Sequence, residues 1–280
     1  MPYRPRPREV AEDSTADPGL DGEARLRLRP PRLLAGQGEP IFGRLPESVL
    51  QNLWNPASET ALLWNLMYPL VQPRLKLESV LELRPLWGSA VEGEERDSLT
   101  PYFWGLDLDG RRLPGLDKSL DRLDGSGPYA EVDLFLLGEQ HLVLVEAKHL
   151  SGLGRCGRFQ AGRCPEIHRP GAEACRYWEE GPAAFRAALD FGARPTPDSA
   201  APPCSRHYQL GRLLLLGRML AERLERRLHL WLLIPLQRWP ALAGDWLDFA
   251  SRVGDQETWR RMRVIGWEQL RSLAPPQMPR

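Results

Sequence analysis

Two acidic residues and one lysine stand in two apolar runs near the middle of the chain. Asp133 belongs to the run 131–137, while Glu146 and Lys148 end the run 141–148. Burying two carboxylates in such runs is costly unless a counter-charge compensates them. Mg²⁺ commonly takes one or two carboxylates plus water as ligands, and an adjacent ammonium can stabilise developing negative charge. The three residues are therefore the leading candidates for a metal-dependent catalytic site.

Phosphodiester hydrolysis is the chemistry that this residue set serves best. A bound metal lowers the pKa of its water, polarises the phosphoryl oxygen and steadies the leaving group. The ammonium of Lys148 can orient the attacking water. The alternative interpretation is a hairpin end that faces solvent, with Glu146-Ala147-Lys148 as an ordinary strand terminus. The aspartate on the partner run, in a position that can be brought into register, favours the catalytic interpretation.

The hairpin register decides whether the three side chains meet. Gly138-Glu139-Gln140 separates the two runs, and a type II′ loop would place Gly138 and Glu139 at its centre because the first position needs a positive φ. Leu137 then faces Gln140, Asp133 faces Leu144 and Glu131 faces Glu146. All the polar residues share one face, with Asp133 diagonal to Glu146. A slip of one residue would send Asp133 to the opposite face.

Further elements are predicted on both sides of this hairpin. A helix begins at Ser58-Glu59, and Pro69 should end it early. Residues 88–128 are rich in turn formers and are predicted to be loops, with a short strand near 102–106. The other predicted elements are strands at 75–86, 228–235 and 262–267, and helices at 173–180, 207–224 and 245–252.

Asp133 followed after a hairpin by Glu146-Ala147-Lys148 resembles the PD-(D/E)XK nuclease superfamily, the restriction-endonuclease-like fold. The resemblance covers roughly residues 57–236. It implies an α/β fold in which helices flank a mixed central sheet, with core order αβββαβ. The chain departs from the family pattern in one place, since Glu131-Val132 rather than a proline precedes Asp133.

The resemblance also implies roles for individual residues. Asp133 and Glu146 would bind Mg²⁺ or Mn²⁺ together with the backbone carbonyl of Ala147, and Lys148 would serve the attacking water. Glu59 is the candidate acid from the first helix, with a carboxylate favourable to the helix dipole as its alternative role. Gln209, beside Tyr208, is the candidate residue on the later helix, where plain helix-start residues are the alternative. The implied enzyme is a metal-dependent deoxyribonuclease, with RNA left open as a substrate.

The four cysteines fall between Lys148 and the long helix, in an irregular insertion at 151–205. This confinement raises the question of a zinc or iron–sulfur site. The spacings are wide and no C-x-x-C pair occurs, which favours unrelated buried thiols instead. The four are Cys156, Cys164, Cys175 and Cys204.

Composition bounds the partners and the domain organisation. The 280 residues carry 37 basic and 37 acidic side chains, so any attraction to phosphate must be local. Residues 1–45 are rich in proline and arginine and are predicted to be a flexible arm, either solvated or phosphate-contacting, before a domain at 46–280. Only Lys76, Lys118 and Lys148 are lysines, which raises interest in Lys148.

Sequence patterns also exclude several classes of protein. No apolar run is long enough to span a bilayer and no signal-peptide core is visible, so a cytoplasmic protein is expected. Walker A, G-x-S-x-G and H-E-x-x-H motifs are absent. The alternative functions are a catalytically idle nuclease-like module that binds nucleic acid and an interaction subunit of a defence or repair assembly. A homodimer or a larger assembly stays open.

Overall fold

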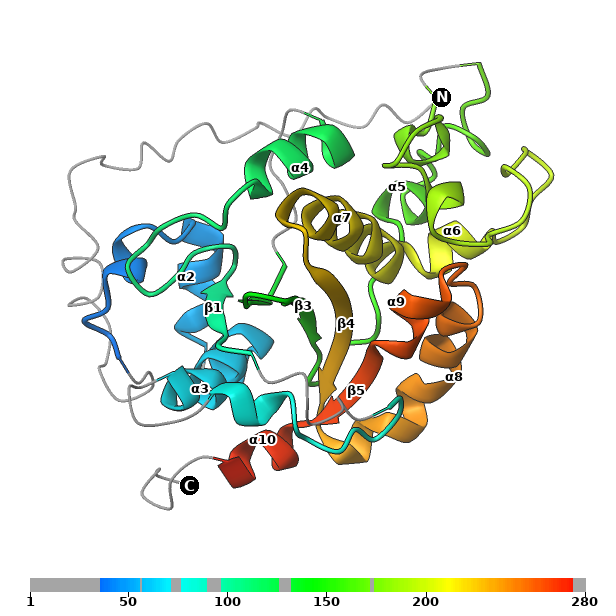
Figure 1. Ribbon diagram of the computed structural model, residues 1–280. Helices are drawn as coiled ribbons and strands as arrows, with labels where there is room; N and C mark the ends of the chain where they lie inside the picture. The colour runs from blue at the N-terminus through cyan, green and yellow to red at the C-terminus, as the bar shows by residue number, and fades with distance from the viewer. Residues whose placement is uncertain are drawn as a thin grey trace, which may run out of the picture.

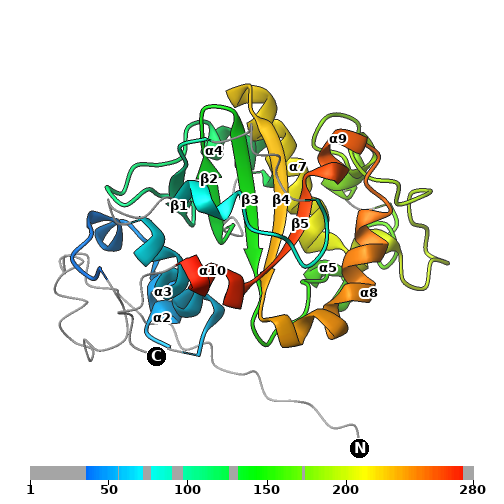
Figure 2. The same ribbon diagram turned by 60° about the horizontal axis from the view of Figure 1, so that its bottom comes forward.

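A five-stranded mixed sheet forms the centre of the molecule. The computed structural model describes residues 36–55, 57–71, 77–89, 97–125, 132–171 and 174–273. The strands follow the chain in order across the sheet, as Figure 2 shows. The first three pair antiparallel, and the third, fourth and fifth pair parallel. They are β1 (Thr100–Phe103), β2 (Leu134–Leu137), β3 (His141–Ala147), β4 (Arg227–Ile234) and β5 (Met262–Gly266).

Helices cover both faces of this sheet, so the expected α/β class with helices flanking a mixed sheet is confirmed. On one face α7 (Tyr208–Leu224) packs against β3 and β4, flanked by α4 (Leu116–Asp124) and α8 (Trp239–Ala250) (Figure 1). The other face carries α2 (Glu47–Leu53), α3 (Glu59–Val71) and α10 (Trp267–Leu273). The short helices are α5 (Gly157–Gln160), α6 (Pro203–Arg206) and α9 (Gln256–Arg260).

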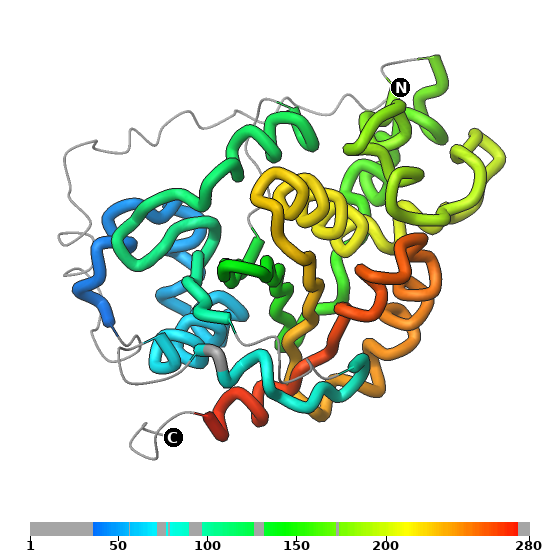
Figure 3. Tube along the Cα trace, in the orientation of Figure 1, coloured from blue at the N-terminus to red at the C-terminus, as the bar shows by residue number. Residues whose placement is uncertain are grey.

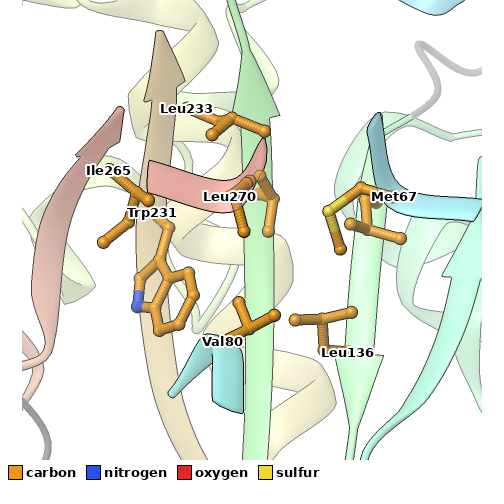
Figure 4. A pocket seen from close by; sticks show the side chains of 9 residues that line it. Met67, Val80, Leu136, Trp231, Leu233, Ile265 and Leu270 are labelled. Carbon is orange, nitrogen blue, oxygen red and sulfur yellow. The ribbon is translucent and has the colours of Figure 1, made fainter. Parts of the chain in front are cut away.

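Side-chain alternation along β3 divides the interior into two cores. Leu142 and Leu144 point towards α7, whereas Val143 and Val145 point towards α3. All residues of β3 are buried, as expected for a strand covered on both faces. The α3 side contains an apolar cavity of about 10 Å³, lined by residues such as Met67, Leu136 and Trp231 (Figure 4). A cavity of this volume has room for one water molecule at most.

The turn between β2 and β3 differs from the predicted one. Gly138 N–H donates to the His141 carbonyl at 2.8 Å, and Leu137 pairs with Leu142. Glu139 and Gln140 are therefore the central residues of the loop, and the predicted register was wrong by two residues. Because two is an even number, every side chain keeps its predicted face. The predicted partner Glu131 lies outside the described residues.

Asp97 holds this turn and explains why glycine stands at position 138. Its carboxylate accepts hydrogen bonds from the backbone N–H groups of Glu139 (2.8 Å), Gln140 (2.8 Å) and His141 (3.0 Å). Gly138 does not have the positive φ that a type II′ loop would need. A Cβ built at this position would instead lie 2.0 Å from Asp97 Oδ2. Close approach of the carboxylate, not backbone conformation, requires the glycine.

The strand predicted at 75–86 was wrong wherever that segment is described. A 3₁₀ turn occupies Leu77–Val80, and Trp87 makes only an isolated bridge to Val264. Leu77, Val80 and Leu81 are buried, a spacing that fits one helical turn rather than alternation. The third strand of the antiparallel group is β1, which comes from the segment predicted to be mostly loop.

Several predicted boundaries also need correction. The helix α3 continues through Pro69 to Val71, since Pro69 and Leu70 are buried in the core that covers its last turn. The predicted helix at 173–180 is a three-residue 3₁₀ turn, Arg176–Trp178, and α4 was not predicted. Residues 1–35 of the predicted arm lie outside the described residues. Within 36–45, Ile41 and Phe42 are buried in the α3-side core, so the fold starts before residue 46.

The longer elements from residue 207 onwards follow the prediction closely, although α9 and α10 were not predicted. The structure contains α7, β4 and β5 within one or two residues of their expected bounds, and α8 starts six residues early, at Trp239 rather than 245. These segments have long, dense apolar patterns that tolerate only one kind of element. Among the described residues, no helix combines the length and apolar character needed to span a membrane.

We predict that Asp97 and Gly138 are energetically coupled. Asp97→Ala should lower the free energy of unfolding by about 2 kcal/mol, because three backbone donors lose a charged acceptor. Gly138→Ala should cost about 1–3 kcal/mol through overlap with the carboxylate. In the double variant the overlap is relieved, so the combined loss should be smaller than the sum. Urea unfolding of all four proteins measures this cycle, and strict additivity would contradict the proposed contact.

Acid should weaken the same contact. Burial alone would raise the pKa of Asp97, but hydrogen bonds from Gln140, Glu139 and His141 lower it below its ordinary value of 3.8. Because the pKa of Asp97 is lower in the folded than in the unfolded protein, its ionised form contributes fully to the free energy of unfolding above the ordinary pKa. This contribution is lost as the pH falls through the pKa of the folded state. The stability difference between wild type and Asp97→Asn should therefore be largest at neutral pH and should shrink in acid. A constant difference would argue against an ionised Asp97.

Candidate active site

The candidate site lies where β3 ends and β2 begins, on the face covered by α7. Leu134 pairs with Val145, so one further step in the same register places Asp133 beside Glu146. Their neighbours Phe135 and Leu144 both belong to the α7-side core, which puts the two carboxylates on one face. Asp133 Oδ2 also accepts a hydrogen bond from the N–H of Ala147 at 2.8 Å.

Lys148 joins this pair from the residue that follows β3. Its Nζ lies 2.8 Å from Glu146 Oε1 and 3.6 Å from Glu59 Oε2. Lys148 and Glu146 are 7% and 4% exposed, so the ion pair is shielded from bulk water. Removing one partner would leave the other as an uncompensated buried charge.

Glu59 stands at the first position of α3 and contacts both the loop after β3 and Lys148. Its Oε1 accepts hydrogen bonds from His149 N (2.7 Å), Ser151 N (3.2 Å) and Ser151 Oγ (2.7 Å). Its Oε2 faces Lys148. The Glu59 carboxylate thus hydrogen-bonds to the loop after β3. It also places a third acidic group at the edge of the site.

Gln209 reaches the site from the first turn of α7. Its Nε2 donates to Glu146 Oε1 at 2.5 Å, and its Oε1 accepts from Gly154 N at 2.6 Å. A Cβ at Gly154 would lie 2.7 Å from that oxygen, so glycine permits the close approach. Gln209 therefore connects the start of the cysteine-containing insertion directly to the Glu146 carboxylate.

Tyr208 points to a different cluster, which sequence reasoning missed. Its hydroxyl lies 3.0 Å from that of Tyr177, which donates to Asp124 on α4 at 2.5 Å. Asp124 also pairs with Arg212 Nη2 at 2.5 Å. Arg212 is 6% exposed, so it belongs neither to a solvated helix face nor to a row of phosphate-contacting arginines. Its position inside the leucine-rich run 210–216 was the available signal.

The electrostatics of the site oppose full ionisation of its acids. Burial and the negative charge of Glu146 raise the pKa of Asp133 well above its usual range. Burial also raises the pKa of Glu146, although Lys148 and, more weakly, Arg212 act against that rise. Burial alone would lower the pKa of Lys148, but Glu146, Asp133 and Glu59 raise it overall. The site therefore carries excess negative potential that a cation would relieve.

The donor set suits a hard divalent cation. Asp133, Glu146 and Glu59 supply carboxylate oxygens, and the carbonyl of Ala147 lies between the last two residues of the E-x-K motif. Across the residues that the structure describes, no three His, Cys, Asp or Glu side chains already have the arrangement of a finished metal site. Glu146 Oε1 contacts both Lys148 and Gln209, so metal binding would require these contacts to be shared or exchanged.

We predict that Asp133→Asn stabilises the protein when metal is absent. The raised folded-state pKa means that ionised Asp133 costs stability at neutral pH, and an amide oxygen can still accept from Ala147. The gain should be about 1 kcal/mol in EDTA. Mn²⁺ should raise the melting temperature of wild type and of the exposed control Asp109→Asn, but not that of Asp133→Asn. Equal Mn²⁺ shifts in all three proteins would contradict metal binding by Asp133.

Comparison with known proteins leaves these contacts as the basis for assigning a function. No protein-family model, curated protein or solved structure matches this chain. Function depends on the chemistry of a site more than on the fold that carries it. Four of the residues predicted from the sequence, Asp133, Glu146, Glu59 and Gln209, are brought together around the ammonium group of a fifth, Lys148, directly or through Glu146.

Proposed function

We propose that the protein is a metal-dependent nuclease that hydrolyses phosphodiester bonds of DNA. The observation that carries the proposal is the convergence of Asp133, Glu146 and Lys148 on one sheet face, within a shielded ion-pair network. Two acids that resist joint ionisation, beside an amine, suit Mg²⁺ or Mn²⁺ binding next to an anionic substrate.

The order of elements supports the proposal. Apart from α4 between β1 and β2 and the short helices between β3 and α7, the order α3, β1, β2, β3, α7, β4 is the one expected of a restriction-endonuclease-like core. The antiparallel group β1–β3 and the parallel addition of β4 also suit that core. We propose on this basis that the chain adopts the PD-(D/E)XK arrangement, with β1 in place of the strand first expected at 75–86.

In the proposed mechanism each residue has a separate task. Asp133, Glu146 and the Ala147 carbonyl would hold the metal, which when bound supplies an activated water and polarises the phosphate. Lys148 would orient the attacking water and stabilise negative charge in the transition state. Glu59 and Gln209 act as positioning residues, since they hold Lys148 and Glu146 through the contacts described above.

We predict that wild-type protein cleaves plasmid or single-stranded DNA in Mg²⁺ or Mn²⁺ and is inactive in EDTA. Lys148→Ala should reduce the cleavage rate by about 10²–10³-fold, the usual cost of removing one transition-state stabiliser. Asp133→Ala should reduce it at least as much. The matched control is Lys118→Ala, which removes an exposed lysine on α4 and should leave the rate unchanged. Circular dichroism would confirm that each variant is folded, and cleavage that persists in both site variants would refute the assignment.

A second candidate function is metal-dependent binding of nucleic acid without cleavage. The observation that favours it is that Lys148 and Gln209 already engage Glu146 Oε1, so a metal bound by the other donors would lack this ligand and with it part of the coordination that cleavage needs. Filter binding with DNA and RNA, run beside the cleavage assay, separates the two functions. Metal-dependent retention without product would select the binding module. A protein that binds neither metal nor nucleic acid in these assays would instead favour the role of an interaction subunit.

A further inference from the structure

The chain between Lys148 and α7 forms a separate excursion from the sheet. Figure 3 traces it, in green to yellow, as a group of loops beside the start of α7. In the described part of 151–206, no helix is longer than four residues and no strand occurs. Several of its side chains, among them Leu153, Trp178 and Phe185, are buried in the α7-side core, so the excursion packs onto the domain with little regular structure of its own.

Backbone contacts bring the four cysteine positions of this excursion together in pairs. Cys156 N–H donates to the carbonyl of Ser205 at 2.8 Å, so Cys156 lies beside the residue that follows Cys204. Cys175 N–H donates to Glu166 Oε1 at 2.7 Å, which ties Cys175 to the segment that follows Cys164.

A shared cavity connects the two pairs. Cys156 and Cys175 both line a cavity of about 750 Å³ between α4, α7 and the excursion. Cys156 and Cys204 are 48 positions apart in the sequence, yet they lie in one region of the fold. The wide spacings, which favoured unrelated thiols in the sequence, do not keep the cysteines apart in the fold.

The surroundings of the sulfurs support one common site. All four cysteines are free, and Cys164 is 8% exposed. The thiols of Cys164 and Cys156 interact electrostatically with that of Cys175. The thiol of Cys204 interacts with all three and receives a hydrogen bond from the indole N–H of Trp178. That buried indole nitrogen has no other hydrogen-bond partner in the described ranges, and an N–H donor of this kind can stabilise a thiolate.

We propose that Cys156, Cys164, Cys175 and Cys204 bind one thiophilic metal centre that holds the excursion together. Four thiolates are the ligand set of a structural zinc ion and of an iron–sulfur cluster alike. Among the described residues no three His, Cys, Asp or Glu side chains are arranged to hold a metal ion, so binding must draw the four sulfurs together and release their protons. The proposal is independent of the nuclease assignment, because it uses none of the carboxylates at the end of β3.

The test is metal content and thiol reactivity of the full chain. The protein would be purified without oxygen from cells supplied with zinc and iron. About one zinc per chain would identify a zinc site, whereas iron with sulfide and visible absorption would identify a cluster. In either case the four thiols should react slowly with a thiol reagent and quickly after metal removal.

Variants sharpen the test. Each single Cys→Ser change should weaken metal binding by at least about tenfold. Removing a group that only orients a metal ligand already has a cost of this size, and here a ligand itself is removed. Arg169→Ser, an exposed change in the same excursion, is the matched control and should retain the metal. Lys148→Ala should also retain it, which separates this site from the catalytic one. The proposal would be overturned if the wild-type protein contained no metal, its four thiols reacted freely, and added Zn²⁺ did not slow that reaction. This result needs no variant, so it does not depend on whether a variant folds.

Discussion

The register of the β2–β3 hairpin is the constraint on which the candidate site depends. Asp133 and Glu146 belong to different strands, and they share a face only if the offset between those strands is correct. The Asp97 carboxylate holds that offset by binding three consecutive backbone N–H groups at the far end of the hairpin. A contact at one end of the sheet thus determines the geometry at the other end.

Acidic side chains of the same hairpin repel one another electrostatically. Asp133, Glu146 and Glu59 surround a single ammonium in a shielded space, and the pKa values of the first two are raised. Strongly shifted pKa values in one buried cluster mark a candidate functional site. Gln209 and Glu59 extend this network into the loop after β3 and into the cysteine-containing excursion.

Three particular segments show where sequence patterns mislead. Residues 75–86 mix apolar and charged residues in near alternation and suggest a strand, yet Leu77, Val80 and Leu81 are buried around one 3₁₀ turn. Gly138 suggested a positive φ, whereas its real constraint is a carboxylate from a residue more than forty positions earlier. Arg212 is a charged residue within a leucine-rich helix, and Asp124 on α4 pairs with it in the interior. In each case a contact distant in the chain outweighed the local preference.

The sequence by itself determined the hairpin, the long helix α7, the parallel strands and the identity of the acidic and basic residues at the end of β3. Those features follow from dense apolar periodicity and from the fact that side chains alternate along a strand, both of which are local. Only the tertiary structure decided the exact register, the identity of the outer strand β1, the contact of Gln209 with Glu146 and the gathering of the cysteines. These depend on contacts between residues far apart in the chain, whose spacing in the sequence carries no information about their distance in space.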